Sequence, residues 1–354
     1  MRAQKDPKTK KWYVQYRYTD WKGDRRKSTK RGFETKKAAE EWVRSFLQMQ
    51  QSDLDMNFED FVRIYLEDVE HRTREHTMIS KRYIINKKIL PYFGKKKVCE
   101  IRVSDVRTWQ NQLLKEGFKA TYLRSINSQL SAIFNHAVKY YNLRENPCAK
   151  AGSIGKNKAD EMSFWTKEEF QRFADRIMDK QASYTAFMTL YWTGIRVGEL
   201  LALTPADIDF EKHTLSITKS YQRLNKKDVI TKPKTPKSIR TISIPVFLEE
   251  TLREYLNVLY GIGDQERMFP YSKHFLEHEM KRGIQASGVK PIRIHDLRHS
   301  HASMLIELGF SPLEIAERLG HERIETTLNT YSHLYPDKQT KLAARLNSEY
   351  REGM

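Results

Sequence analysis

The sequence predicts a multidomain α+β protein in three parts: a small N-terminal β-sheet with one helix, an all-α bundle, and a mixed, mainly α part with a small antiparallel sheet. A length of 354 residues allows two or three domains. The spacing of apolar residues changes from strand-like alternation to helical periodicity and then to a mixture of the two. A stretch over 147–162, which begins with Pro147, has the composition of a linker. We therefore expect domains over residues 1–50, 53–150 and 160–354.

The composition indicates a folded protein in a reducing compartment. Hydrophobic residues make up 39% of the chain and aromatic residues 11%, which argues against disorder. We find no apolar run of about 18 residues and no signal peptide, so neither a membrane span nor secretion is expected. The two cysteines, Cys99 and Cys148, cannot build a disulfide framework. A cytoplasmic location is the expectation that follows.

The positive charge points to a polyanionic partner. Lys and Arg number 63 against 45 Asp and Glu, which gives a formal net charge of +18. Nucleic acid is favoured over an acidic membrane because no basic amphipathic helix stands out. Half of the excess, +9, falls in residues 1–50.

Residues 1–50 predict a β-hairpin followed by a helix. The run from Trp12 to Tyr18 alternates aromatic or β-branched with polar residues, and a turn signal over 21–24 precedes the basic run 25–31. We expect a third strand at Gly32-Phe33 and a helix after Thr35, a typical N-cap. Such a sheet can present side chains to a DNA groove. The candidates are Tyr16, Arg17, Arg25, Arg26 and Lys27; the alternative is a solvated basic hairpin without a ligand.

Residues 53–150 predict a bundle of four helices. Apolar residues recur at helical spacing over 58–66, from 104 to a stop at Gly117, and in a long stripe over 123–137. A less regular helix is expected over 77–90. The exposed faces are basic, and the candidate DNA contacts are Lys95, Lys96, Lys119 and Arg124, although any one of them could equally be a solvated surface charge.

The third part contains the residues that suggest chemistry. We expect helices near 166–180 and 182–204, strands over 214–218 and 239–244, and helices beyond. Arg196 lies between Gly194 and Gly198 in an otherwise apolar segment, where a partly desolvated guanidinium would bind a phosphate strongly. The alternative is a structural ion pair with an acid such as Glu199.

Further cationic and aromatic groups follow along the chain. The run 232–237 holds three lysines on or near an expected hairpin tip, where an ammonium could enter a site or simply face DNA. His295 and Arg298 share one side of a helix and could converge on a phosphate. His295 and His299 also have a zinc-ligand spacing, but a third ligand is not obvious. Gly320-His321 and then Tyr331 complete the series, and a tyrosine there could simply pack in a core.

In chain order, these segments resemble the catalytic signature of tyrosine recombinases, the phage-integrase family. That signature comprises Arg196, a hairpin lysine, His295-x-x-Arg298, Gly320-His321 and Tyr331. The resemblance covers residues 165–340 by motif. It extends to the whole chain by architecture, because the first two parts are similar to the arm-binding and core-binding domains of integrases from phages and conjugative transposons.

The resemblance implies a site-specific recombinase that integrates and excises a mobile element. Tyr331 would attack the scissile phosphodiester, keep the 3′-phosphate and release a 5′-hydroxyl. Arg196 and Arg298 would clamp the non-bridging oxygens of the transition state. His295 and His321 would add hydrogen bonds, and His295 would also be a candidate acceptor for the Tyr331 proton.

The same resemblance assigns the remaining roles. Lys234 matches the lysine that protonates the leaving 5′-oxygen, with Lys232 and Lys237 as alternatives, and Glu199 would orient Arg196 or His295. No metal and no cofactor are implied, because arginines and a lysine supply the cationic groups. Tyr335, which precedes Pro336, is a less favoured nucleophile than Tyr331.

The implied partner is double-stranded DNA, at both core and arm attachment sites. We expect a homotetramer on DNA, a monomer without it, and help from a directionality factor and a host DNA-bending protein. The segment 338–350 is expected to form a short helix that packs on its own or a neighbouring subunit. A type IB topoisomerase and a non-catalytic DNA-binding regulator are alternatives, and among recombinases the basic residues 1–50 favour an integrase over a chromosome-dimer resolution enzyme.

Overall fold

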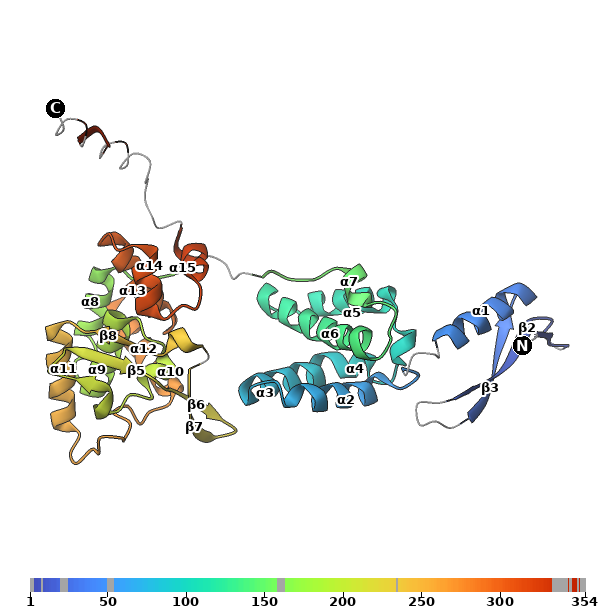
Figure 1. The fold of residues 1–354 in the computed structure, drawn as a ribbon, viewed down its shortest axis with the longest axis horizontal. Helices are drawn as coiled ribbons and strands as arrows, with labels where there is room; N and C mark the ends of the chain where they lie inside the picture. The colour runs from blue at the N-terminus through green and yellow to red at the C-terminus, as the bar shows by residue number, and fades with distance from the viewer. Residues whose placement is uncertain are drawn as a thin grey trace. The chain divides into compact units, whose positions relative to one another are not determined.

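The computed structural model describes residues 3–7, 9–19, 25–49, 54–157, 163–233 and 235–332, together with 343, 346–348 and 350. The chain divides into two compact units, Met1–Asp160 and Glu161–Met354 (Figure 1). Separate clusters of buried apolar side chains form within the first 50 residues, within 54–151 and within 165–331. Among the described residues, none of the helices is long and apolar enough to cross a membrane.

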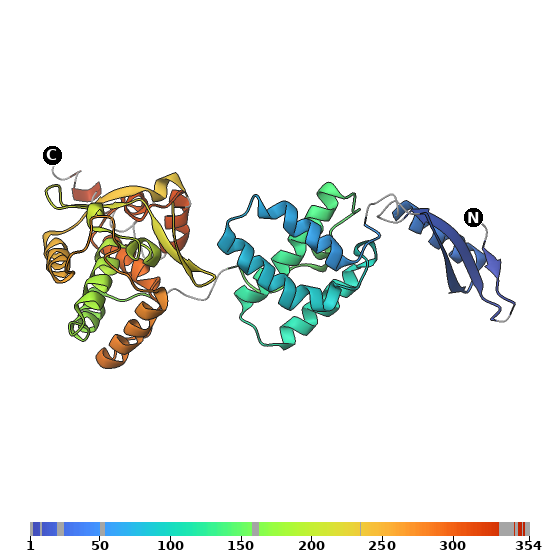
Figure 2. The same cartoon turned by 90° about the horizontal axis from the view of Figure 1, so that it is seen from below.

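The N-terminal segment is a three-stranded antiparallel sheet with one helix on it. Strand β2 (Trp12–Thr19) lies between β1 (Gln4–Lys5) and β3 (Arg25–Phe33), and α1 (Lys36–Met49) lies along one face of the sheet (Figure 2). Thr35 caps α1 as expected, since its Oγ1 accepts the Ala38 N–H at 3.1 Å. The prediction of a strand at Gly32-Phe33 is wrong as to its place: these residues end β3, and the third strand is β1. The predicted turn lies outside the described residues.

The two faces of this sheet differ in what they expose. Val14 and Tyr16 are buried under α1, and the Tyr16 ring packs edge-on against Trp42 with 5.4 Å between centroids. Arg17 pairs with Lys27 across the strands, and both are exposed on the opposite face. The expectation that Tyr16 faces a DNA groove is therefore wrong, because its ring belongs to the small core under α1. By strand alternation, Arg26 also lies on the α1 side, while Arg25 shares the open face with Arg17.

Residues 54–157 are helical, as predicted. The main helices are α2 (Phe58–Glu70), α3 (Glu75–Ile84), α5 (Val103–Lys115) and α6 (Ala120–Tyr140). The apolar stripes expected on α2 and α6 are buried in one core. After α3 the chain forms a π-helical turn, η1 (Ile85–Ile89), before the short α4 (Leu90–Phe93). Pro91 explains why the predicted 77–90 helix is irregular, because proline cannot donate the α-helical hydrogen bond and its ring crowds the preceding turn.

The predicted linker is largely structured. Pro147–Ala151 forms α7, whose Cys148 and Ala151 side chains are buried in the helical core. Gly155 has φ +80°, and a Cβ there would lie 2.0 Å from the Ala120 carbonyl oxygen. The Lys156 N–H donates to that same carbonyl at 3.2 Å. A chain segment held this closely belongs to the helical part, so the prediction of a linker from residue 147 is wrong up to residue 156.

The unit 161–354 combines helices with two small antiparallel sheets. The first sheet has the order β4 (Ile208–Asp209), β5 (Thr214–Ile217) and β8 (Arg240–Ser243); the second is the hairpin of β6 (Ser220–Leu224) and β7 (Lys227–Thr231). The helices are α8 (Lys167–Asp175), α9 (Gln181–Thr193), α10 (Val197–Leu200), α11 (Val246–Val258), α12 (Lys273–Ser287), α13 (Asp296–Glu307), α14 (Pro312–Leu319) and α15 (Ile324–Tyr331). Short 3-10 turns lie at η2 (Val98–Glu100) in the helical part, and at η3 (Pro205–Asp207) and η4 (Pro236–Ser238) here.

Two predictions for this unit need correction. The helix expected over 182–204 is two helices, because Gly194 ends α9 in the left-handed conformation with φ +68°. The hairpin tip is at Asn225 and Lys226, which adopt φ of 48° and 65°, so the lysine-bearing run 232–237 lies after β7 rather than at the tip. In the predicted C-terminal helix, residues 343, 346–348 and 350 are helical, and the rest of 338–350 lies outside the described residues.

Candidate active site

The turn between α9 and α10 places Arg196 at the start of a helix. A Cβ on Gly194 would lie 2.6 Å from the His301 ring, so only glycine fits this left-handed position. Arg196 is the N-cap of α10 and its side chain is 38% exposed. The guanidinium therefore reaches the surface from a rigid, buried turn.

Glu199 holds Arg196 in place. Its carboxylate is 3% exposed and accepts the Arg196 backbone N–H at 3.0 Å and the Arg196 Nη1 at 2.7 Å. It also accepts Nη2 of Arg240 at 3.0 Å. Burial opposes ionisation of Glu199, but the charges of Arg240 and Arg196 outweigh it and lower the pKa below its ordinary value. Of the two residues that Glu199 was expected to orient, Arg196 and His295, these contacts reach Arg196.

Arg298 is the most deeply buried cation of the site. It is 3% exposed, and its Nη1 and Nη2 donate to the carbonyls of Gly194 at 2.8 Å and Leu319 at 2.7 Å. Burial, and then the charge of Arg196, lower the Arg298 pKa to about 9. The two carbonyls fix the guanidinium without neutralising it, so the site retains positive charge that would favour an anion.

His295 and His321 lie at the ends of helices near these arginines. His295 precedes α13, and burial followed by the charge of Arg298 lowers its pKa. His321 follows Gly320, and its Nδ1 lies 2.7 Å from Thr327 Oγ1. Burial lowers the pKa of His321 to about 3, with Arg298 and Arg196 adding to the effect. Both imidazoles are therefore neutral at physiological pH.

Tyr331 ends α15 with its ring inside the unit. It is 1% exposed and packs with Ile306, Ile315 and Leu319. Its hydroxyl lies 2.7 Å from Nδ1 of His299. Burial raises the pKa of Tyr331 to about 12, although Arg298 opposes the shift. The phenol is therefore un-ionised and held by one neutral imidazole.

His299 is a site residue that sequence reasoning missed. His295 is the candidate acceptor that the family motif suggests for the Tyr331 proton, but the structure places His299 beside that hydroxyl, with 5.6 Å between the His299 and Tyr331 rings. The His295 and His299 rings pack edge-on, 5.2 Å apart, as their spacing of four residues on a helix implies. That spacing was the available signal, and it suggested zinc; among the described residues, no group of three or more His, Cys, Asp or Glu is placed to hold a metal ion.

Not every predicted site residue can be placed. Lys234 and Tyr335 lie outside the described residues, whereas the alternatives Lys232 and Lys237 are exposed in the loop between β7 and β8. In the helical part, Lys95 and Lys119 are exposed and Arg124 is partly buried. Lys96 is engaged, since its Nζ lies 2.5 Å from Asp105 Oδ1 and 5.1 Å from the Tyr92 ring.

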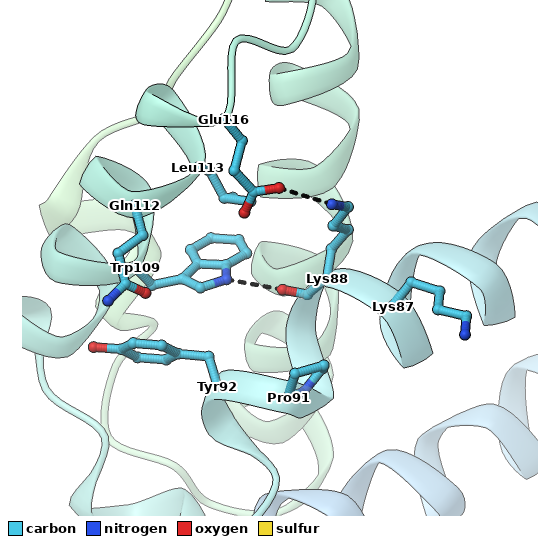
Figure 3. Close-up of a pocket in the computed structure, with 8 residues that line it drawn as sticks. All are labelled: Lys87, Lys88, Pro91, Tyr92, Trp109, Gln112, Leu113 and Glu116. Carbon is cyan, nitrogen blue, oxygen red and sulfur yellow. Dashed lines mark hydrogen bonds and ion pairs between the residues drawn. The ribbon is translucent and has the colours of Figure 1, made fainter.

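A separate pocket of about 210 Å³ lies in the helical part (Figure 3). The Trp109 Nε1 donates to the Lys88 carbonyl at 2.9 Å, and the Lys88 ammonium pairs with Glu116 at 2.9 Å. These contacts pair the Trp109 indole N–H and the Lys88 and Glu116 charges at the pocket wall. No residue of the candidate active site lines it.

Comparisons with known proteins identify the family to which this fold belongs. Residues 163–338 match the phage integrase family, 57–114 match the N-terminal SAM-like domain of phage integrases, and 3–49 match an arm DNA-binding domain. The chain belongs to the phage integrase family of tyrosine recombinases.

Its relatives include integrases of mobile elements. The ICEBs1 integrase of Bacillus subtilis (strain 168) is 34% identical over 307 residues, which span 82% of this chain and 83% of that protein. The transposase from transposon Tn916 of Enterococcus faecalis is 22% identical over 311 residues, 79% of this chain and 75% of the other. The structure of the Tn1549 transposon integrase in complex with transposon right end DNA matches this fold with a TM-score of 0.68 at 19% sequence identity. The match covers 82% of this chain and 98% of the Tn1549 integrase chain. This chain is a site-specific recombinase of the integrase class, which sets aside the topoisomerase and regulator alternatives.

The buried imidazoles predict that acid destabilises the unit 161–354. Burial lowers the pKa of His299 to about 4 and that of His301 and His321 to about 3, against 6.5 for a free imidazole. The unfolded chain therefore binds more protons, and stability is lost as pH falls below 6.5. Each imidazole contributes up to about 1.4 kcal/mol per pH unit. Hydrogen exchange of α13 amides at pH 7.5 and 5.5, corrected for intrinsic rates, should report this loss.

The same experiment has an internal control. His299→Asn removes one of the three imidazoles and should make the pH dependence shallower. Carboxylates remain ionised throughout this pH range, so they do not contribute. Equal stability of α13 at both pH values would contradict the prediction.

The contact between His299 and Tyr331 predicts a graded set of cleavage rates. His299→Ala should slow covalent capture of DNA by about 10- to 100-fold, because the phenol loses its positioning partner. His299→Asn should retain more activity than His299→Gln, because the Asn amide can occupy the position of Nδ1 whereas that of Gln reaches further. Single-turnover cleavage of a suicide substrate measures these rates, and rates equal to that of the parent protein for Ala, Asn and Gln would contradict a role for this hydrogen bond.

Proposed function

We propose that Tyr331 is the nucleophile of this recombinase and that Arg196, Arg298, His295 and His321 stabilise the phosphoryl transition state. One observation supports this above others: the Tyr331 hydroxyl is buried beside Arg298, whose guanidinium hydrogen-bonds to backbone carbonyls that do not neutralise its charge. A scissile phosphate entering the site would supply the missing negative charge. The family assigns the same chemistry to the matching motif positions.

The proposed reaction conserves bonds and protons. The Tyr331 oxygen forms a bond to phosphorus as the bond to the 5′-oxygen breaks, and the 3′-phosphate remains on the enzyme. The phenol proton passes to an imidazole, for which the contact at 2.7 Å favours His299 over His295. A lysine of the 232–237 loop gives a proton to the 5′-oxygen, with Lys234 favoured over Lys232 and Lys237. Attack by a 5′-hydroxyl from another strand reverses these steps and rejoins the DNA.

Residues 1–50, 53–150 and 160–354 are proposed as arm-binding, core-binding and catalytic domains. The match of 3–49 to an arm DNA-binding domain supports the first assignment. Of the five expected groove contacts, Arg17, Arg25 and Lys27 lie on the open face of its sheet and remain candidates, whereas Tyr16 and Arg26 lie on the α1 side. For the core-binding part, Lys95, Lys119 and Arg124 remain candidates, with Lys96 already paired to Asp105.

The partners are proposed from the family. The protein would bind core and arm attachment sites of a mobile element as a tetramer and would be monomeric without DNA, in the cytoplasm. A solved relative, lambda integrase, forms a tetramer bound to a Holliday junction. A directionality factor and a host DNA-bending protein would assist the choice between integration and excision.

Tyr331→Phe tests the nucleophile. The variant should bind core-site DNA but form no covalent adduct with a nicked suicide substrate, because no oxygen remains to attack phosphorus. Tyr335→Phe is the matched control and should form the adduct at close to the normal rate. An adduct that persists in Tyr331→Phe would refute the assignment, and sequencing the trapped DNA would give the cleavage position.

The open sheet face predicts which side chains set arm-site affinity. Replacing Arg17 and Lys27 with Ala should weaken arm-DNA binding and lower the slope of log Kd against log salt by about 2. Lys30→Ala removes a cation from the α1 side, where Lys30 lies 5.7 Å from the Trp42 ring, and should change affinity less. Deleting residues 1–50 should abolish arm binding yet leave core-site cleavage largely intact. If Lys30→Ala weakened arm-DNA binding as much as the replacement of Arg17 and Lys27, the assignment of the open face to DNA would be contradicted.

A further inference from the structure

Arg240 connects three segments of the active site through one buried side chain. It is the first residue of β8, and its side chain is 7% exposed. Its Nη2 donates to Glu199 Oε2 at 3.0 Å, its Nε to the Arg318 carbonyl at 2.8 Å, and its Nη1 to the Ser238 carbonyl at 3.0 Å. The three acceptors belong to α10, to the end of α14, and to the loop that precedes β8.

Each of these segments carries a residue of the proposed chemistry. Glu199 orients Arg196, the end of α14 leads into His321, and Ser238 closes the loop that carries the candidate lysines. Gly320 permits close packing here, because a Cβ at this position would lie only 2.9 Å from the Lys237 carbonyl oxygen and 3.0 Å from the Arg240 side chain. The turn before His321 therefore packs directly on Arg240 and on the lysine-bearing loop.

The guanidinium is suited to this task and not to phosphate binding. A planar fork of N–H donors can hold three acceptors in fixed directions, which a lysine ammonium on a flexible stem cannot do. Arg196 is 38% exposed at the surface, whereas Arg240 is buried and directs its described hydrogen bonds to protein oxygens. Arg240 thus acts through its neighbours.

We propose that Arg240 is a positioning residue that sets the 232–238 loop relative to Arg196 and His321, so that the leaving-group acid and the phosphate clamp are aligned together. The proposal rests on the assignment of the general acid to a lysine of this loop. Loss of Arg240 should chiefly impair proton delivery to the 5′-oxygen. It should affect DNA binding much less, because Arg240 is not exposed to the phosphate.

A substrate with a 5′-bridging sulfur separates this role from a general structural one. A thiolate leaves without a proton, so a defect confined to the acid disappears on the sulfur substrate and remains on the oxygen substrate. Single-turnover cleavage by the full-length protein would be compared for Arg240→Lys and Arg240→Met on both substrates. We expect at least about a 10-fold loss with oxygen, a much smaller loss with sulfur, and little change in Kd for core DNA.

Two sets of variants act as controls. Arg253→Lys alters a half-exposed arginine that pairs with Glu249 away from the site, and should match the parent protein on both substrates. The acid is identified by comparing Lys232→Ala, Lys234→Ala and Lys237→Ala. The lysine that acts as the acid is the one whose replacement slows cleavage of the oxygen substrate but not of the sulfur substrate. If the sulfur substrate rescued Lys232→Ala or Lys237→Ala instead of Lys234→Ala, the proposed acid would change, but the role of the loop would be supported.

Two outcomes would overturn the proposal. The first is that Arg240→Lys retains its affinity for core DNA but loses the same factor in cleavage rate on the oxygen and sulfur substrates. This outcome counts when the sulfur substrate rescues cleavage by one of the loop lysine variants. The second is rescue of none of the three lysine variants, which would remove the acid from this loop. Arg240→Lys keeps the charge beside Glu199 and so remains informative if Arg240→Met does not fold.

Discussion

A single buried carboxylate organises the cationic site of this integrase. Glu199 neutralises part of the charge of Arg196 and Arg240, while Arg298 is held by carbonyls alone. The site therefore contains more guanidinium charge than its acid can compensate. Such an imbalance costs folding free energy, because a buried charge without a counterion is poorly solvated. The same imbalance favours the non-bridging oxygens of a phosphate, whose charge increases in the transition state.

The surroundings of Tyr331 complement that arrangement. Burial keeps the phenol protonated, and the uncharged His299 ring shares a hydrogen bond with it. A neutral phenol is a weak nucleophile, so the free protein does not hold a reactive phenolate. An entering phosphate changes this balance, because its negative charge favours protonation of nearby imidazoles. In the proposed mechanism, proton transfer from Tyr331 and binding of the phosphate would thereby be coupled electrostatically.

Local sequence patterns predicted most of the fold, and they failed where distant segments meet. The apolar stripe of α6 is buried as predicted, since its periodicity is a property of one helix. The break at Gly194 was missed because both flanking segments are apolar, and the His301 ring and Leu319 side chain that demand a glycine pack against it only in the fold. In the N-terminal sheet, alternation placed Tyr16 and Arg17 on opposite faces, but only the position of α1 shows which face is covered.

The candidate site divides in the same way. Arg196, Arg298, His295, His321 and Tyr331 could be proposed because each lies in a recognisable motif. His299 and Arg240 could not, since their partners are remote: 32 residues separate His299 from Tyr331, and 78 separate Arg240 from Arg318. Their roles follow from the packing of α13 on α15 and of β8 on α14, and a sequence pattern contains no information about such pairs until the chain is folded.

Burial also separates the two uses of positive charge in this chain. Arg17 and Lys27 are exposed on an open sheet face, where ions screen their attraction to DNA over about 10 Å at 0.1 M salt. Arg298 and Arg240 are enclosed by protein, so mobile ions reach them poorly and their interactions vary less with salt. Ionic strength should therefore govern how tightly the integrase holds DNA, while the geometry fixed by Glu199 governs how fast a bound phosphate reacts. In the proposed division of roles, the excess of +9 in residues 1–50 would serve affinity, because the residues proposed for the chemistry all lie in the unit 161–354.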